Sequence, residues 1–119
     1  AWFEVVEMMN QKNAAGKTAL EHMAKSSGTD LAGFQAQLDT TKLFATPREA
    51  LDFATSKQLP ETMRKVAEFS FQHGLLGEGA KDTSAVGMAF ANGVTSGDKA
   101  NLKLRFDPTY VQLAADAKL

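Results

Sequence analysis

The sequence has 119 residues, an apolar share of 44%, a formal net charge of −1 and no cysteine. This length allows one domain at most, or part of one, and the apolar share is enough for a core. A net charge of −1 provides no basic surface that would attract nucleic acid. The lack of cysteine excludes disulfides and thiolate metal sites. No apolar run approaches the roughly 18 residues that a membrane span requires.

Apolar periodicity and capping signals predict five helices before residue 74. They cover residues 2–12, 14–26, 30–40, 47–56 and 60–73. Asn13 and the pair Thr29-Asp30 are suitable N-caps for the second and third helices. Thr46-Pro47-Arg48-Glu49 has the form of a capping box with proline at the first helical position, and it predicts the start of the fourth helix.

The fifth predicted helix, 60–73, has the clearest pattern. Pro60 suits its first turn, His73 suits its last turn, and Gly74 is the expected left-handed stop. One stripe at helical spacing is predicted to face inward. Its members are Met63, Val66, Ala67, Ser70 and Phe71, with Phe69 widening the stripe.

From Gly74 onward the composition changes, because most of the nine glycines fall between residues 74 and 100. We expect a long glycine-rich surface excursion over 77–101 with one short ordered piece. Residues 102–106 alternate as a short strand would, and Asp107-Pro108 predicts the start of a last helix with Val111, Ala114 and Ala115 facing inward. No sheet larger than a two-stranded ribbon is expected.

The sequence predicts no catalytic residue, metal ligand or cofactor. Residues 74–81 superficially resemble a phosphate-binding loop, but no lysine follows directly on the second glycine. His22 and His73 have no partners at metal-ligand spacing, and Glu4 and Glu7 suit the exposed side of the first helix. Trp2 is the one candidate for ligand contact, with a place in the helix core as the alternative.

Short signatures follow one another along nearly the whole chain. In order they are Ala1-Trp2-Phe3-Glu4, Asn13, Ala19, Met23-Ala24-Lys25, Gly28, Phe34, Leu38, Leu43-Phe44, Thr62-Met63, Val66-Ala67-Glu68-Phe69, Gly74-Leu75-Leu76 and Phe106-Asp107-Pro108 leading into Tyr110-Val111. This order resembles the C-terminal third of nitrate/sulfonate/taurine-type solute-binding proteins of ABC importers. The subgroup encoded beside urea- or amide-metabolising enzymes is the closer resemblance.

The resemblance implies a two-lobed α/β fold of the type II periplasmic-binding-protein kind, in which a cleft captures a small polar or anionic solute without catalysis. It also implies a periplasmic or lipid-anchored extracellular location and a membrane permease as partner. Residues 1–119 would form a mainly α segment of five or six short helices. No binding residue is transferred, because most ligand-contacting loops would lie upstream of Ala1.

The alternative is a stand-alone helical interaction module that dimerises and takes no small ligand. If upstream lobes are missing, we expect the isolated chain to associate with itself, because surfaces that those lobes would cover need another partner. The side chains expected to drive this association are Trp2, Phe3, Val6, Phe69 and Phe71. The competing outcome is that the same side chains already close a core within one chain.

Overall fold

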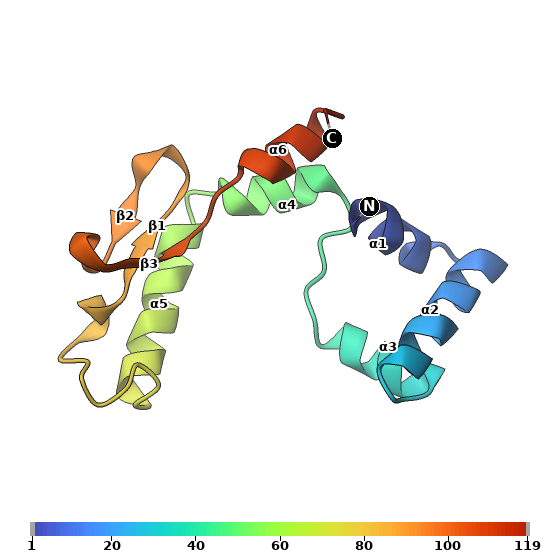
Figure 1. Ribbon diagram of the computed structural model, residues 1–119, viewed down its shortest axis with the longest axis horizontal. Coiled ribbons are helices and arrows are strands. Elements are labelled where there is room, and N and C mark those ends of the chain that lie inside the picture. Colours follow the sequence, from blue (N-terminus) through green and yellow to red (C-terminus); the bar gives the residue numbers. More distant parts are fainter. Residues whose placement is uncertain (1, 119) are drawn as a thin grey trace. The chain divides into compact units, whose positions relative to one another are not determined.

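The computed structural model describes residues 2–118, within which lie six α-helices and one three-stranded sheet (Figure 1). The mainly helical fold predicted from the sequence is therefore confirmed. Ala1, which opens the first signature, lies outside the described residues. By its contacts the chain divides into two compact units, Ala1–Ala50 and Leu51–Leu119, and each is described in turn.

The first unit contains helices α1 (Trp2–Asn10), α2 (Ala14–Ser26) and α3 (Leu31–Asp39). Both predicted caps are present: Oδ1 of Asn13 accepts the Gly16 N–H at 2.9 Å, and Oδ1 of Asp30 accepts the Gly33 N–H at 2.8 Å. Helix α1 ends two residues earlier than predicted, because the chain must turn sharply for the Asn13 cap. The boundaries of α2 agree with the prediction.

Helices α1 and α2 approach each other closely at Gly16. A Cβ atom there would lie only 2.0 Å from the carbonyl oxygen of Gln11 and 2.9 Å from that of Met8. Val6 and Ala24, with exposed fractions of 2% and 1%, are the buried hydrophobic residues of this unit within the described chain. The expectation that Val6 would be available for association is therefore wrong.

Helix α4 (Pro47–Ala54) begins in the first unit and continues into the second. Its capping box is confirmed: Thr46 Oγ1 accepts the Glu49 N–H at 3.2 Å, and Glu49 Oε2 accepts the Thr46 N–H at 3.3 Å. The same carboxylate oxygen also accepts the Ala45 N–H at 3.0 Å. The helix start is thus held mainly by local bonds, which explains why four residues predicted it.

In the second unit, helix α5 (Leu59–Gln72) turns a narrower face inward than predicted. Leu59 is buried, and Met63 and Ala67 pack against the same cluster. Val66, Phe69 and Phe71, which were placed on the inner stripe, are instead 46%, 56% and 36% exposed. The stripe was drawn too wide because only one row of α5 meets the rest of this unit.

The end of α5 follows the predicted pattern. Gly74 has φ +69°, and the Leu75 N–H bonds back to the Ser70 carbonyl at 2.8 Å, which closes the helix. The His73 ring stacks on Phe69 with centroids 4.0 Å apart, and its Nδ1 lies 2.8 Å from the Phe69 carbonyl oxygen. His73 is therefore a helix-end residue, as predicted.

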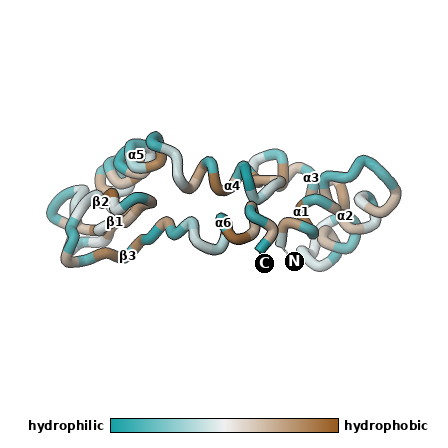
Figure 2. Tube along the Cα trace, turned by 90° about the horizontal axis from the view of Figure 1, so that it is seen from above, coloured by the Kyte–Doolittle hydropathy of each residue, from teal (hydrophilic) through white to brown (hydrophobic). Residues whose placement is uncertain are grey.

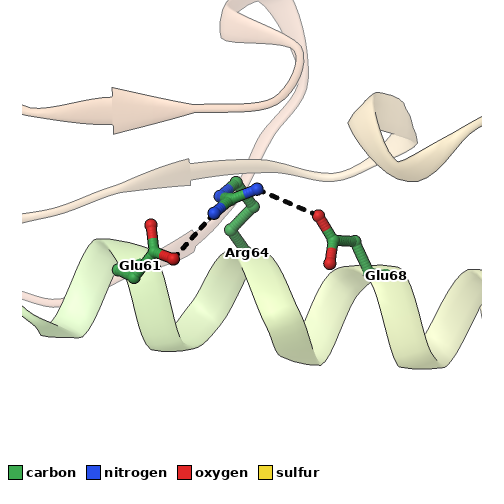
Figure 3. A network of polar contacts seen from close by, with 3 residues as sticks. All are labelled: Glu61, Arg64 and Glu68. Atoms are coloured by element: carbon green, nitrogen blue, oxygen red, sulfur yellow. Dashed lines mark hydrogen bonds and ion pairs between the residues drawn. The ribbon is translucent and has the colours of Figure 1, made fainter.

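The outer face of α5 carries a small charge network (Figure 3). Arg64 reaches Glu61 at 2.7 Å and Glu68 at 3.1 Å, one turn to each side. The hydrogen bond to Glu61, followed by the charges of Glu61 and Glu68, raises the pKa of Arg64. All three side chains are about half exposed, so this network supports the helix locally and holds no ligand site.

The second unit also contains a sheet in the order β2-β1-β3, formed by β1 (Gly87–Ala89), β2 (Thr95–Ser96) and β3 (Leu102–Arg105). β1 pairs antiparallel with β2 and parallel with β3. The expectation of no sheet beyond a two-stranded ribbon is wrong. Short 3-10 helices at Thr83–Ala85, Ala91–Gly93 and Lys99–Asn101 make up much of the remaining connections.

Two strands of this sheet, β1 and β2, lie inside the segment 77–101 that was expected to be a surface excursion. Met88 and Phe90 are buried beside Leu59, and Phe90 stacks nearly parallel on Phe106 with centroids 5.1 Å apart. The predicted strand at 102–106 is present as β3. The segment is therefore the centre of the second unit's core, not its periphery.

Two backbone features make this sheet possible. Asn92 and Gly93 have φ of 60° and 73°, the combination that a tight hairpin turn requires between β1 and β2. A Cβ at Gly87 would lie 1.9 Å from the Asp98 carbonyl oxygen, so β1 approaches the Asp98 segment too closely for any larger residue.

The last helix, α6 (Thr109–Ala115), starts where predicted. The Asp107 carboxylate accepts hydrogen bonds from the Thr109 hydroxyl at 2.6 Å and from the Thr109 N–H at 2.9 Å. The three α6 residues that were predicted to face inward are partly buried, as is Leu113, whereas Tyr110 is 72% exposed. The three are Val111, Ala114 and Ala115.

Candidate functional site

The residues considered for chemistry in the sequence lie at the surface of the units to which they belong. Glu4, Glu7, His22 and His73 are all exposed, and within residues 2–118 no group of three or more histidine, aspartate or glutamate side chains could hold a metal ion. Trp2 is 65% exposed on α1. No described helix is long and apolar enough to cross a membrane, and Figure 2 shows short brown and teal stretches alternating along the helices.

Two hollows in the first unit share a wall and together form what we call the trough. The lysine hollow has a volume of 540 Å³ and the aspartate hollow a volume of 260 Å³. Both are lined by Met9, Asn10, Leu20 and Gln35. The lysine hollow adds Gln11, Lys12, Asn13, Lys17 and Leu31, and the aspartate hollow adds Leu38, Asp39, Thr41, Lys42 and Leu43.

Local sequence explains how the lysine hollow is formed. The cap at Asn13 forces a turn between α1 and α2, and Asn13 Nδ2 also donates to Gln11 Oε1 at 3.1 Å. Lys12 lies in this turn, and Lys17 follows on the first turns of α2. Two ammonium groups and several side-chain amides therefore converge around one short connection.

The opposite wall comes from α3. Its cap at Asp30 starts the helix so that Leu31 and Gln35 lie four residues apart on one face. Leu38 follows three residues later, and Asp39 is the last residue of the helix. This wall therefore consists of two leucine side chains, the amide of Gln35 between them and the carboxylate of Asp39 at the end of the helix.

The electrostatics of the lysine hollow favour an anion. Among its described lining residues Lys12 and Lys17 are the charged ones, and both are positive. Lys17 Nζ lies 3.8 Å from the Glu21 carboxylate, but the two side chains are 69% and 51% exposed, so this pair is weak and leaves the ammonium able to bind another partner. Ammonium and amide donors can hold a small polar or anionic molecule reversibly.

A second surface feature is an apolar groove of 600 Å³ between α1 and α2. It is lined mostly by methionine, valine and alanine side chains, with Thr18 and His22 as its polar members. Val5 and Met8, which border it, are 42% and 45% exposed. The lining residues are Val5, Met8, Ala14, Ala15, Thr18, Ala19, His22 and Met23.

Sequence reasoning did not find the trough. Its polar residues come from three helices and two connections, so no single motif contains them. One signal was available: lysines on both sides of the predicted Asn13 cap place two positive charges near a helix start. Trp2, the residue that was singled out, is not among the residues that line the trough.

Comparisons with known proteins return no match: no family model, no curated protein and no solved structure is significantly similar to this chain.

Proposed function

We propose that the chain is part of a solute-binding protein of an ABC importer and that it contributes to the capture of a small polar or anionic solute. The lysine hollow carries this proposal, because it joins two ammonium groups and several amides over an apolar floor. The order of sequence signatures supports the same class. The protein then acts by binding alone, in the periplasm or anchored outside the cell, and delivers its solute to a membrane permease.

This proposal treats residues 1–119 as one C-terminal segment of a larger two-lobed protein. The apolar surface left on α1 and α5 supports it, since Trp2 and Phe69 are 65% and 56% exposed. Such side chains are normally covered in a complete lobe. The isolated chain should therefore be tested for direct solute contact first, because the lysine hollow lies wholly within it.

A titration followed by amide NMR tests the proposal. Nitrate, an alkyl sulfonate and urea are added separately to the isotopically labelled chain. We expect saturable shifts centred on Lys12, Asn13 and Lys17 with at least one of the three. Lys17→Gln should weaken this binding, whereas Lys25→Gln, an exposed α2 change outside the hollow, should not. Shifts that do not saturate, or that Lys17→Gln leaves unchanged, would contradict solute capture here.

The second candidate function is a dimerising interaction module, and the apolar groove favours it. Trp2, Val5 and Met8 are exposed on α1, and the groove continues this apolar surface onto α2. A helix from another copy could cover it about a two-fold axis. Sedimentation tests the module: a mass that stays at 12.8 kDa at every concentration would contradict it. A mass that rises with concentration is expected for both candidates, and Met8→Glu should return it to the monomer value only where the apolar groove is the interface.

A further inference from the structure

The tip of the β1–β2 hairpin brings a side-chain amide and an open backbone nitrogen together at the surface. Asn92 is followed directly by Gly93, and both residues are exposed, with φ of 60° and 73°. A Cβ at Gly93 would meet no atom within 4 Å, so nothing crowds this part of the chain. The Asn92 amide carbon and the Gly93 nitrogen are also close enough in the chain to close a five-membered ring.

The side chain of Asn92 is free to move at this tip. Among the described residues its amide has no hydrogen-bond partner. The other capped or bridged asparagines are held: Asn13 Oδ1 accepts the Gly16 N–H at 2.9 Å. Asn101 Nδ2 likewise donates to the Ala85 carbonyl oxygen at 2.9 Å.

The backbone of the tip is closed only weakly. The Val94 nitrogen lies 3.4 Å from the Ala91 carbonyl oxygen, whereas the Phe90 nitrogen lies 2.8 Å from the Val94 carbonyl oxygen. The longer bond is the weaker one. The tip can therefore open locally, so that Asn92 rotates, while the bond at the base of the hairpin stays in place.

We propose that Asn92 is a site of spontaneous chemical modification, in which it loses its side-chain amide to the backbone nitrogen of Gly93. The Gly93 nitrogen bonds to Asn92 Cγ, the bond from Cγ to Nδ2 breaks, and Nδ2 leaves as ammonia with the proton from the Gly93 N–H. Water then opens the cyclic imide. Cleavage of the new bond gives aspartate at position 92, and cleavage of the original peptide bond gives isoaspartate. The reaction needs no ligand and does not depend on the proposed function.

The two products should differ in their effect on the second unit. Aspartate keeps the turn, because Asp-Gly fits the same hairpin geometry as Asn-Gly. Isoaspartate adds one backbone carbon to the tip, which moves Val94 away from its partner Phe90. Phe90 is 7% exposed and packs with Leu59 and Met88, so a change at the surface loosens the core of this unit.

Peptide masses followed over time test the assigned position. The complete chain is kept folded in mildly alkaline buffer, and samples are digested and weighed. The peptide that contains Asn92 should gain one mass unit first, because a hydroxyl replaces an amino group. Asn10, which is exposed and followed by Gln11, is the matched control. A gain that appears first at Asn10, Asn13 or Asn101, or that requires urea, would overturn the proposal.

Two variants test the reaction itself. Asn92→Asp keeps the turn and should abolish the fast phase of ammonia release, so a fast phase that survives would show that the site is wrong. Gly93→Ala should slow the release, because a methyl group shields the attacking nitrogen. Since φ of +73° also strains alanine there, amide NMR checks its fold, and Asn92→Asp decides the question if the hairpin is lost.

The separated products test the consequence for stability. In urea, the aspartyl form should unfold at the same midpoint as the parent, and the isoaspartyl form at a lower one. Equal midpoints for the two forms would show that the tip is not coupled to the Phe90 cluster.

Discussion

Both units of this chain contain a glycine at which the backbone comes close to carbonyl oxygens, Gly16 in the first and Gly87 in the second, but the two units pack different side chains around it. At Gly16 two helices meet, and the first unit buries mainly small or β-branched side chains such as Val6 and Ala24. At Gly87 a strand meets a loop, and the second unit fills its centre with Leu59, Met88 and Phe90.

This difference has a consequence for binding. Small residues bring helix backbones together but leave the long side chains around them spread apart, and the trough and the apolar groove both lie in the first unit. Large aromatic residues close the centre of the second unit, where Phe90 stacks on Phe106. The hollows of 540 and 600 Å³ thus lie in the first unit, whereas a hollow of 280 Å³ lies beside Phe90 in the second. The stability of the second unit depends on a few large side chains.

The largest expected loss in the free energy of unfolding is at Leu59, which is 2% exposed in the centre of the second unit. Leu59→Ala removes buried methyl groups and leaves a cavity, at a cost of roughly 2–5 kcal/mol. Urea unfolding measures it, and Leu75→Ala, at a leucine that is 67% exposed, is the matched control. Similar losses from the two variants would show that the second unit does not depend on this cluster.

Gly16→Ala is expected to have the next largest effect, a lower free energy of unfolding for the first unit. The new methyl group would overlap the Gln11 carbonyl oxygen, and overpacking costs roughly 1–3 kcal/mol. The better helix propensity of alanine, worth about 1 kcal/mol, offsets only part of this cost. Amide exchange should accelerate in α1 and α2.

Gly79→Ala is the control for this change, because a Cβ there meets no atom within 4 Å. It should leave the free energy of unfolding unchanged or slightly higher. If Gly16→Ala behaves like Gly79→Ala, then close approach of α1 to α2 is not what holds the first unit together.

The capping box before α4 should have a smaller effect. Thr46→Ala removes the oxygen that accepts the Glu49 N–H, and a lost N-cap typically costs about 1 kcal/mol. Thermal melting compares it with Thr62→Ala, an exposed change inside α5 where alanine is the better helix former. Equal melting temperatures for Thr46→Ala and the parent would mean that Thr46 does not cap the helix.

The smallest expected effect is on the pH dependence of stability, through the Asp107 carboxyl group at the start of α6. Hydrogen bonds from the Thr109 hydroxyl and then from its N–H lower the pKa of Asp107 from its ordinary value of 3.8. A lowered carboxyl pKa adds stability that is complete above the ordinary pKa and is lost as pH falls through the lower, folded value. Carbon NMR titration should show the Asp107 pKa rising toward 3.8 in Thr109→Ala.

Asp82 offers a parallel case, since the Ser84 hydroxyl and N–H lower its pKa in the same way. Ser84→Ala should raise the pKa of Asp82 and leave that of Asp107 unchanged. An Asp107 pKa that does not respond to Thr109→Ala would show that the hydroxyl contributes nothing to the start of α6.

The helices could be predicted because their signals are local. Asn13, Asp30 and the Thr46–Glu49 pair each satisfy backbone groups within four residues, so the sequence alone shows the bond partners. The prediction of inner faces was less successful, because Val66 and Phe69 are apolar at the right spacing and yet remain exposed. Periodicity shows which residues share a helix face, but only tertiary packing decides how much of that face is covered.

The sheet and the trough depend on contacts between distant residues. Asn92-Gly93 is a strong hairpin signal that we did not use, and it would have indicated the β1–β2 pair. Nothing local indicates that β3 pairs in parallel with β1, because Met88 and Leu104 are far apart in sequence. The trough was missed for the same reason, since Lys17 and Gln35 line one hollow, and Gln35 and Asp39 the other, only after the helices have packed.

The parallel pairing of β1 with β3 sets an order of events during folding. A hairpin turn can bring β2 onto β1 as soon as Asn92 and Gly93 are in place, but β3 must wait until the chain has passed through β2 and the 3-10 helix at Lys99–Asn101. Closing this longer loop costs entropy before any pairing is gained. We therefore expect helix formation to precede the sheet, and a ribosome-bound chain that ends before Leu102 to carry β1 with one edge still unpaired.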